Sequence, residues 1–168
     1  YTRAEKLEKV REKMNELGAD VFVIPALDEI AWLLNLRGGD VLYTPVFLSY
    51  LLLERGKATL CVQKEAVSAE IEAHLAADGV ALAPYDDIYP LVASLPKGTR
   101  VLLDGERANY RITQSVGTGV ETIDRPSPIQ LMKAMKHPAE QENERIAHIR
   151  DGVAVTRFIY WLKHTIGK

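Results

Sequence analysis

The sequence has few of the features that mark secreted, membrane-spanning or nucleic-acid-binding proteins. It contains one cysteine, Cys61, within the apolar segment 58–62, and the simplest interpretation is a buried, reduced thiol in a cytoplasmic protein. It has no run of eighteen apolar residues, so we expect no membrane-spanning helix. The formal net charge of −2 argues against nucleic acid or an anionic membrane as a partner.

The sequence also lacks the common catalytic signatures. It has no Gly-x-Ser-x-Gly motif, no P-loop and no dinucleotide-binding glycine pattern. His148 has the helical spacing to share a face with Glu144 and Asp151, but no further ligand follows at a telling distance, so we interpret the three as a helix surface rather than a metal site. We therefore predict no catalytic residue and no metal ligand in this chain.

The composition is that of an ordinary soluble domain. Apolar residues make up 47% of the 168 residues and charged residues 26%. This length fits one domain with an additional element at one end. The chain begins with Tyr1 and has no signal-like apolar segment behind it, so we expect it to be part of a longer protein.

The most informative stretch is residues 26–50, which begins with an amphipathic helix. Leu27, Ile30 and Leu34 repeat at helical spacing, and we interpret Asp28 and Glu29 as acidic residues that favour the positive end of the helix dipole. Because glycine adopts left-handed backbone conformations without steric cost, we expect the pair Gly38-Gly39 to end this helix. The apolar run 46–53 then predicts a strand covered on both faces.

The rest of the chain alternates helices with strands. Thr2 and Glu5 form a capping box at the start of the first helix, and Gly18 ends it. The turn 54–57 makes its two flanking strands antiparallel neighbours. The expected helices are 2–17, 65–77, 88–95, 109–116 and 129–135, and the expected strands are 20–24, 46–53, 58–62, 80–84, 100–104 and 121–124. This order predicts an α/β fold, a three-layer sandwich with a mixed sheet of five or six strands flanked by helices.

A long C-terminal helix follows at 142–165. Its apolar positions spread over more than one face, so the helix needs partners on two sides, which a compact sandwich does not easily supply. We therefore divide the chain into a domain of residues 1–135 and a segment, 136–168, that begins a second domain.

Two opposite charges flank the glycine pair, in the sequence Asn35-Leu36-Arg37-Gly38-Gly39-Asp40. Arg37 and Asp40 either close the loop as an ion pair or are presented to a ligand or another domain. Tyr43 extends the same loop and would form part of the same lip.

These residues carry a family resemblance. The sequence ALDEIAWLLNLRGGDV, followed by Pro-Val-Phe and an apolar strand, resembles the middle domain of three-domain aminopeptidases P, which belong to the creatinase/prolidase, or "pita-bread", metallopeptidases. The first helix looks like the entry into that domain. Residues 133–136 and 140–162 look like the linker and the first helix of the catalytic domain.

The resemblance implies that the whole enzyme is a peptidase and that this chain alone is inactive. In the family, two aspartates, a histidine and two glutamates of the catalytic domain bind two divalent ions, usually manganese, and the bridging water attacks the peptide bond before proline. None of the motifs that carry these ligands occurs here, so we expect the chain alone to be inactive, without a cofactor of its own.

The resemblance also implies partners and a site. The expected partners are the catalytic domain of the same protein and a second copy in a homodimer, with proline-containing peptides as substrates of the whole enzyme. The resemblance implies a rim of the active-site cleft formed by Arg37, Asp40 and Tyr43. A free-standing, non-enzymatic binding or assembly domain of the same fold is the alternative, and an autonomous small-molecule enzyme is disfavoured.

Overall fold

The computed structural model describes residues 1–166. The chain divides after Lys133 into two compact units. The helices are α1 (Arg3–Glu16), α2 (Leu27–Leu34), α3 (Ala69–Ala77), α4 (Ile88–Ala93), α5 (Tyr110–Ser115), α6 (Pro128–Ala134) and α7 (Pro138–Thr165), with short 3₁₀ turns η1 (Lys64–Ala66) and η2 (Tyr85–Asp87). The strands are β1 (Val21–Ile24), β2 (Ser49–Glu54), β3 (Ala58–Val62), β4 (Val80–Pro84), β5 (Arg100–Leu103) and β6 (Glu121–Asp124).

The strands form one six-stranded mixed sheet in the order β4-β3-β2-β1-β5-β6. β2 runs antiparallel to both of its neighbours, with Leu53 opposite Phe22 of β1 and opposite Ala58 of β3. The pairs β1–β5, β3–β4 and β5–β6 are parallel. The predicted mixed sheet and the predicted hairpin at 54–57 are therefore confirmed.

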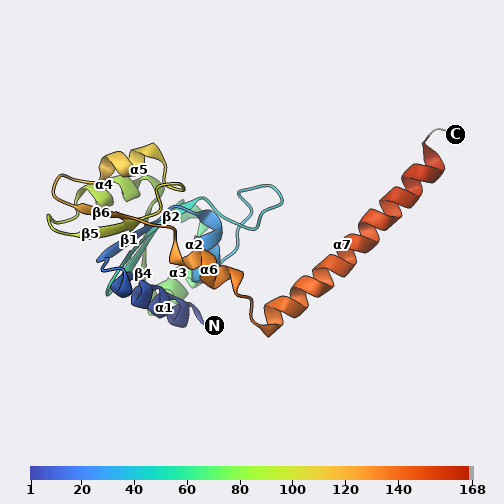
Figure 1. Cartoon of the computed structure of the whole chain (residues 1–168), viewed down its shortest axis with the longest axis horizontal. Helices are drawn as coiled ribbons and strands as arrows, with labels where there is room; N and C mark the ends of the chain where they lie inside the picture. Colours follow the sequence, from blue (N-terminus) through green and yellow to red (C-terminus); the bar gives the residue numbers. More distant parts are fainter. Residues whose placement is uncertain (167–168) are drawn as a thin grey trace. The chain divides into compact units, whose positions relative to one another are not determined.

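Helices cover the sheet on both faces. Figure 1 shows α4 and α5 on one side and α1 and α3 on the other. Because successive strand residues point to opposite faces, Phe22 and Ile24 join the core beneath α1, α2, α3 and α6, whereas Val21 and Val23 join the core beneath α4 and α5. All four residues of β1 are buried, so the predicted three-layer sandwich is confirmed.

The start of α3 differs from the prediction. We expected a helix from residue 65, but residues 64–66 form a 3₁₀ turn and Val67 is extended, with φ −104° and ψ 119°. The helix begins after Ser68 because the Ser68 side chain accepts a hydrogen bond from the main-chain N–H of Ile71. Leu75 is fully buried as expected, whereas Ile71 is 37% exposed.

Cys61 lies in β3 and is fully buried, as its apolar context predicted. Burial raises the pKa of the Cys61 thiol to about 12, and the charge of Asp87 adds to the effect. A thiol of this kind stays protonated and packs as a small apolar side chain.

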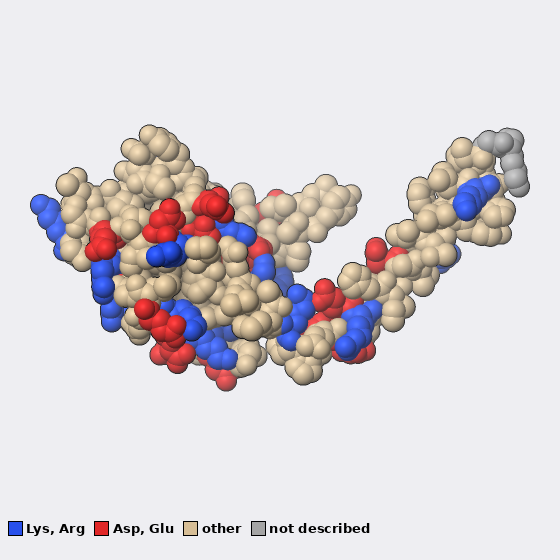
Figure 2. All heavy atoms as spheres, viewed as in Figure 1, with Lys and Arg blue, Asp and Glu red and all other residues tan. Residues whose placement is uncertain are grey.

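The helix α7, taken by itself, begins at Pro138, four residues earlier than predicted. His137 is its N-cap residue, and the main-chain N–H of His137 donates to the Glu140 carboxylate at 3.1 Å. It buries none of its side chains, and much of its surface in Figure 2 is uncharged. Within residues 1–166, no helix is both long and apolar enough to cross a membrane.

Candidate functional site

The parallel strands bring their carboxyl ends to one edge of the sheet. β1, β3, β4, β5 and β6 all end there, and the segments that follow β1 and β5 carry the polar residues of two neighbouring features. In open α/β sheets this edge is where ligands bind. One feature is the loop 35–48 between α2 and β2, and the other is a buried polar network.

The loop begins earlier than the glycine pair predicted. α2 ends at Leu34, and Asn35 adopts the left-handed conformation, with φ 54°. Asparagine tolerates this conformation better than other side chains, and Lys6 holds it by donating to the Asn35 side-chain oxygen at 2.7 Å. The expectation that Gly38-Gly39 ends the helix is therefore wrong.

Gly38 has a different role, which is close packing. A Cβ atom on Gly38 would lie 2.6 Å from the Cβ of Phe47 and 3.0 Å from the carbonyl oxygen of Val46. The two sides of the loop therefore approach each other at a distance that only glycine permits.

Arg37 fastens the start of the loop to the end of α2. Its Nη1 donates to the carbonyl oxygen of Ala31 at 3.0 Å and to that of Leu36 at 2.8 Å. A positive charge here also interacts favourably with the partial negative charge at the C-terminal end of α2. Its Nε and Nη2 donate no hydrogen bond to any of the residues that the structure describes.

Asp40 closes the loop, but not through Arg37. Its Oδ2 accepts a hydrogen bond from the main-chain N–H of Leu48 at 2.8 Å, and its own N–H donates to the carbonyl of Val46 at 3.2 Å. Within residues 1–166, Arg37 and Asp40 form no ion pair with each other. The two charges instead bind the main chain on opposite sides of the loop.

Tyr43 lies in the turn between the bridged residues Val41 and Thr44. The loop that contains this turn projects from the sheet in Figure 1. Tyr43 is 96% exposed and has a left-handed backbone with φ 63°, next to Leu42, which is 77% exposed. This conformation costs about 1–2 kcal/mol for a non-glycine residue. The Thr44 N–H, which donates to the Val41 carbonyl at 3.1 Å, helps to hold it.

A pocket of about 200 Å³ lies at the base of the loop. Its lining comes from the loop, the end of β3, η1 and α3. The lining residues are Leu36, Arg37, Gly38, Gly39, Asp40, Phe47, Leu60, Val62, Gln63, Ala66, Val67 and Ile71. The loop thus brings Arg37 and Asp40 to one pocket, whereas Tyr43 is not part of its lining.

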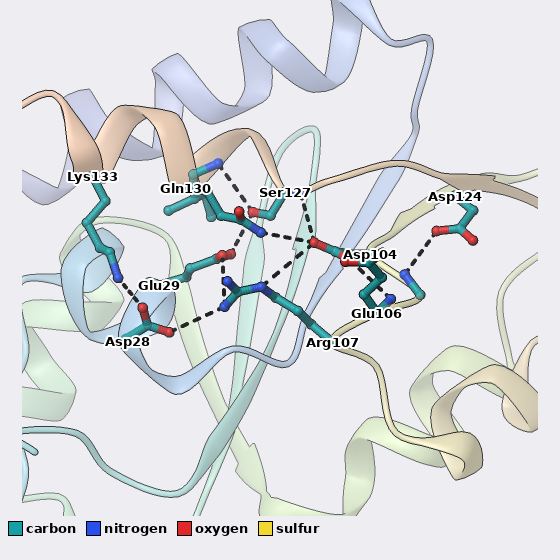
Figure 3. A network of polar contacts seen from close by, with 11 residues as sticks. Asp28, Glu29, Asp104, Glu106, Arg107, Asp124, Ser127, Gln130 and Lys133 are labelled. Carbon is teal, nitrogen blue, oxygen red and sulfur yellow. Dashed lines mark hydrogen bonds and ion pairs between the residues drawn. The ribbon is translucent and has the colours of Figure 1, made fainter.

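The polar network at the same edge of the sheet was not predicted. Figure 3 shows Glu29 of α2, Asp104 at the end of β5 and Ser127 at the start of α6 close together. The Ser127 hydroxyl donates to Glu29 Oε2 at 2.6 Å, and the Ser127 N–H donates to Asp104 Oδ2 at 3.1 Å. Gln130 also donates to Asp104 Oδ2, at 3.1 Å. These bonds hold α6 against the carboxyl edge of the sheet.

Charge at the network is balanced by Arg107 and Lys133. The Arg107 Nη1 lies 3.8 Å from Glu29 Oε1 and 3.9 Å from Asp28 Oδ1, and its Nε lies 3.9 Å from Asp104 Oδ2. Lys133 donates to Asp28. Burial raises the pKa of Asp28, but the hydrogen bond and charge of Lys133 outweigh it and lower that pKa. The earlier interpretation, that Asp28 and Glu29 interact only with the helix dipole, was therefore incomplete.

Glu29 is the unusual member of this network, because it is only 1% exposed. Burial raises its pKa, although the Ser127 hydroxyl and Arg107 oppose the shift. Its Oε1 is buried and accepts no hydrogen bond from any residue that the structure describes. The sequence signal for this group was an acidic pair after β1 and an aspartate after β5, since parallel neighbours end at the same edge.

We expect Glu29→Gln to remove a pH dependence of stability. Because the folded pKa of Glu29 lies above its ordinary value of 4.5, the folded state holds this proton more tightly than the unfolded state. Stability from this group is therefore present at low pH and is lost as the pH rises from 4.5 through the raised pKa. Glutamine keeps an acceptor for Ser127 without the charge. Urea unfolding across this range, with the exposed Glu121→Gln as control, should show the variant gaining stability relative to the parent as the pH rises; parallel pH profiles would contradict it.

The histidine that was weighed as a metal ligand, His148, lies on α7. His148 Nε2 lies 3.9 Å from Glu144 Oε1, and both side chains are exposed. Across residues 1–166, no three His, Cys, Asp or Glu side chains are grouped to hold a metal ion.

Comparison with known proteins gives the family. The creatinase/prolidase N-terminal domain family matches residues 1–140. The chain is 37% identical over 163 residues to Xaa-Pro aminopeptidase 1 of Dictyostelium discoideum, covering 96% of this chain and 26% of that protein. The chain spans about a quarter of the length of the curated relatives that it matches.

Solved structures give the same result. An X-prolyl aminopeptidase of Caenorhabditis elegans, described as a cytosolic enzyme with a di-nuclear active site, superposes with a TM-score of 0.86 at 29% identity, over 100% of this chain and 28% of that one. An Xaa-Pro dipeptidase of Bacillus anthracis shares the fold, with a TM-score of 0.57 at 12% identity over 84% of this chain and 38% of that one. The chain therefore belongs to the creatinase/prolidase N-terminal domain family and is homologous to the corresponding part of Xaa-Pro aminopeptidases.

Proposed function

We propose that this chain is the non-catalytic domain of a metal-dependent Xaa-Pro aminopeptidase, a hydrolase that removes an N-terminal residue preceding proline. The observation that carries the proposal is 37% identity to such an enzyme across 96% of the chain. In this role the chain alone is inactive and shapes the active-site cleft and the interface of a homodimer. The cytosolic description of the C. elegans relative supports a cytoplasmic location.

The loop 35–48 forms the rim of the cleft. It projects from the sheet, and its own hydrogen bonds hold Asp40 and the exposed Tyr43 in place. Arg37 presents a cation at its base. A rim cation attracts the C-terminal carboxylate of a short peptide, and a narrow mouth excludes folded proteins.

Residues 136–168 form the linker and the first helix of the catalytic domain. The observation that supports this role is that α7 exposes large apolar side chains such as Ile149, Val153 and Phe158, which are 67%, 53% and 57% exposed. Such side chains gain free energy when another surface covers them. The covering surface is the catalytic domain of the same protein.

The residues present do not fit the metal pair of such an enzyme. Asp28, Glu29 and Asp104 all lie within 4 Å of Arg107 and so already have a cation. We place the two divalent ions, manganese in the family, in the catalytic domain. No step of the hydrolysis is assigned to this chain.

Arg37→Ala in the whole enzyme tests the rim. Loss of a hydrogen-bonded charge pair with the peptide carboxylate should raise KM for short peptides about tenfold. We expect kcat to stay unchanged, because the contact is equal in the ground and transition states. The exposed Arg125→Ala, beyond β6, is the matched control. Unchanged KM for Arg37→Ala would reject the rim.

Activity of the chain itself separates the alternatives. Cleavage of a Xaa-Pro peptide by the 168-residue chain would reject the non-catalytic role. If the gene that encodes the chain holds no metallopeptidase domain, the alternative of a free-standing binding or assembly domain replaces the proposal.

A further inference from the structure

The pocket at the base of the loop has the chemistry of a binding site for the last residue of a peptide. We infer that it takes an apolar C-terminal side chain, while Arg37 binds the α-carboxylate beside it. This inference rests on the rim function for its place in the whole enzyme. The binding itself concerns this chain alone.

The interior of the pocket is apolar. Leu36 and Phe47 close it on the loop side, and Leu60, Val67 and Ile71 close it on the side of β3 and α3. Its volume of about 200 Å³ accommodates one large side chain rather than a helix or a folded segment. Burying such a side chain should strengthen binding about tenfold or more.

Arg37 gives the mouth of the pocket its charge. It is the one cationic side chain among the described lining residues. Its Nη1 is fixed on the carbonyls of Ala31 and Leu36. That leaves Nε and Nη2, the edge of a guanidinium that binds a carboxylate through two parallel hydrogen bonds. The fixed Nη1 also means that little side-chain entropy is lost when the ligand binds.

Asp40 makes the site selective. Its Oδ2 is occupied by the Leu48 N–H, and the second oxygen has no hydrogen-bond partner among residues 1–166. A carboxylate oxygen of this kind accepts the N–H of the last peptide group. The same negative charge disfavours a doubly charged phosphate, which a single arginine does not balance. The pair therefore matches a free peptide C-terminus.

The test uses the 168-residue chain and small probes. N-acetyl-L-leucine, its amide and N-acetylglycine are titrated while amide resonances are followed by NMR. We expect N-acetyl-L-leucine to shift residues 36–40, 47 and 60–71. The leucine amide, which lacks the carboxylate, and N-acetylglycine, which lacks the side chain, should each bind about tenfold more weakly.

Variants separate the two halves of the site. Arg37→Gln should weaken N-acetyl-L-leucine about tenfold, and Arg125→Gln, with the same change of charge, should leave it unchanged. Ala66→Phe places a ring in the pocket and should abolish the preference for leucine over glycine. Equal binding of acid and amide, shifts elsewhere in the chain, or no saturable binding would each overturn the inference.

The pocket inference and the rim function can be rejected independently of each other. If Arg37→Ala raises KM but the parent enzyme has equal KM for peptides that end in glycine and in leucine, the rim function is supported and the pocket is rejected. If N-acetyl-L-leucine binds as expected but Arg37→Ala leaves KM unchanged in the whole enzyme, the pocket is supported and the rim is rejected.

Discussion

Asp104→Ala lowers the free energy of unfolding by about 3 kcal/mol, since removing one member of a buried polar network leaves its partners unsatisfied. Asp104 is 5% exposed. Its Oδ2 accepts from the Ser127 N–H and from Gln130, and its Oδ1 accepts from the Glu106 N–H at 3.2 Å. Ser127 is itself buried, so water does not replace the lost acceptor. The start of α6 should therefore loosen together with the loss of stability.

The measurement is urea unfolding combined with hydrogen exchange. Asp124→Ala is the matched control, because Asp124 is the last residue of a strand that ends at this edge and accepts a main-chain N–H, that of Gly105, but is exposed. We expect the control to change stability by less than about 0.5 kcal/mol, as exposed substitutions usually do. Faster exchange in 127–133 should accompany only Asp104→Ala. Equal effects of the two variants would show that burial of the network contributes nothing.

Gly38→Ala destabilises the loop, whereas Gly39→Ala does not. A Cβ on Gly38 would meet the Cβ of Phe47 at 2.6 Å, and Phe47 packs against the main core. A Cβ on Gly39 would meet nothing within 4 Å. Forcing an atom into packed surroundings costs about 1–3 kcal/mol, so we expect a loss of about 2 kcal/mol at Gly38 and less than about 0.5 kcal/mol at Gly39.

The location of the destabilisation in Gly38→Ala also tests this explanation. In Gly38→Ala, the N–H groups of Asp40, Val46 and Leu48 should exchange faster, because their hydrogen bonds hold the loop. The same change should reduce binding at the pocket, since Phe47 is part of its lining. Equal exchange in the two glycine variants would contradict a tightly packed loop base.

Much of the fold was predictable because its signals are local. The capping box of Thr2 and Glu5 and the glycine stop at Gly18, with φ +72°, both depend on residues a few positions apart. The apolar run likewise contains a strand buried on both faces, although β2 begins at Ser49 rather than at residue 46. The start of α3 was misplaced because the apolar spacing continues through residues 65–68, while the Ser68 cap decides where the helix begins.

The site was only partly predictable. Arg37, Asp40 and Tyr43 were singled out because charges beside a glycine pair are unusual, but the main-chain carbonyls that hold Arg37 are not visible in a pattern of residue types. The prediction that Gly38-Gly39 ends the helix failed for the same kind of reason. Asn35 ends it, supported by Lys6 from a different helix.

By itself, the sequence determined the order of helices and strands, the absence of a catalytic signature and the family, because caps, periodicity and a continuous motif are properties of neighbouring residues. The tertiary structure decided which distant side chains meet. Glu29 and Ser127 are 98 positions apart, and they touch because β1, β5 and β6 are parallel and end at one edge. Strand order depends on how whole faces pack, and burial depends on what covers a residue, so neither can be read from local spacing.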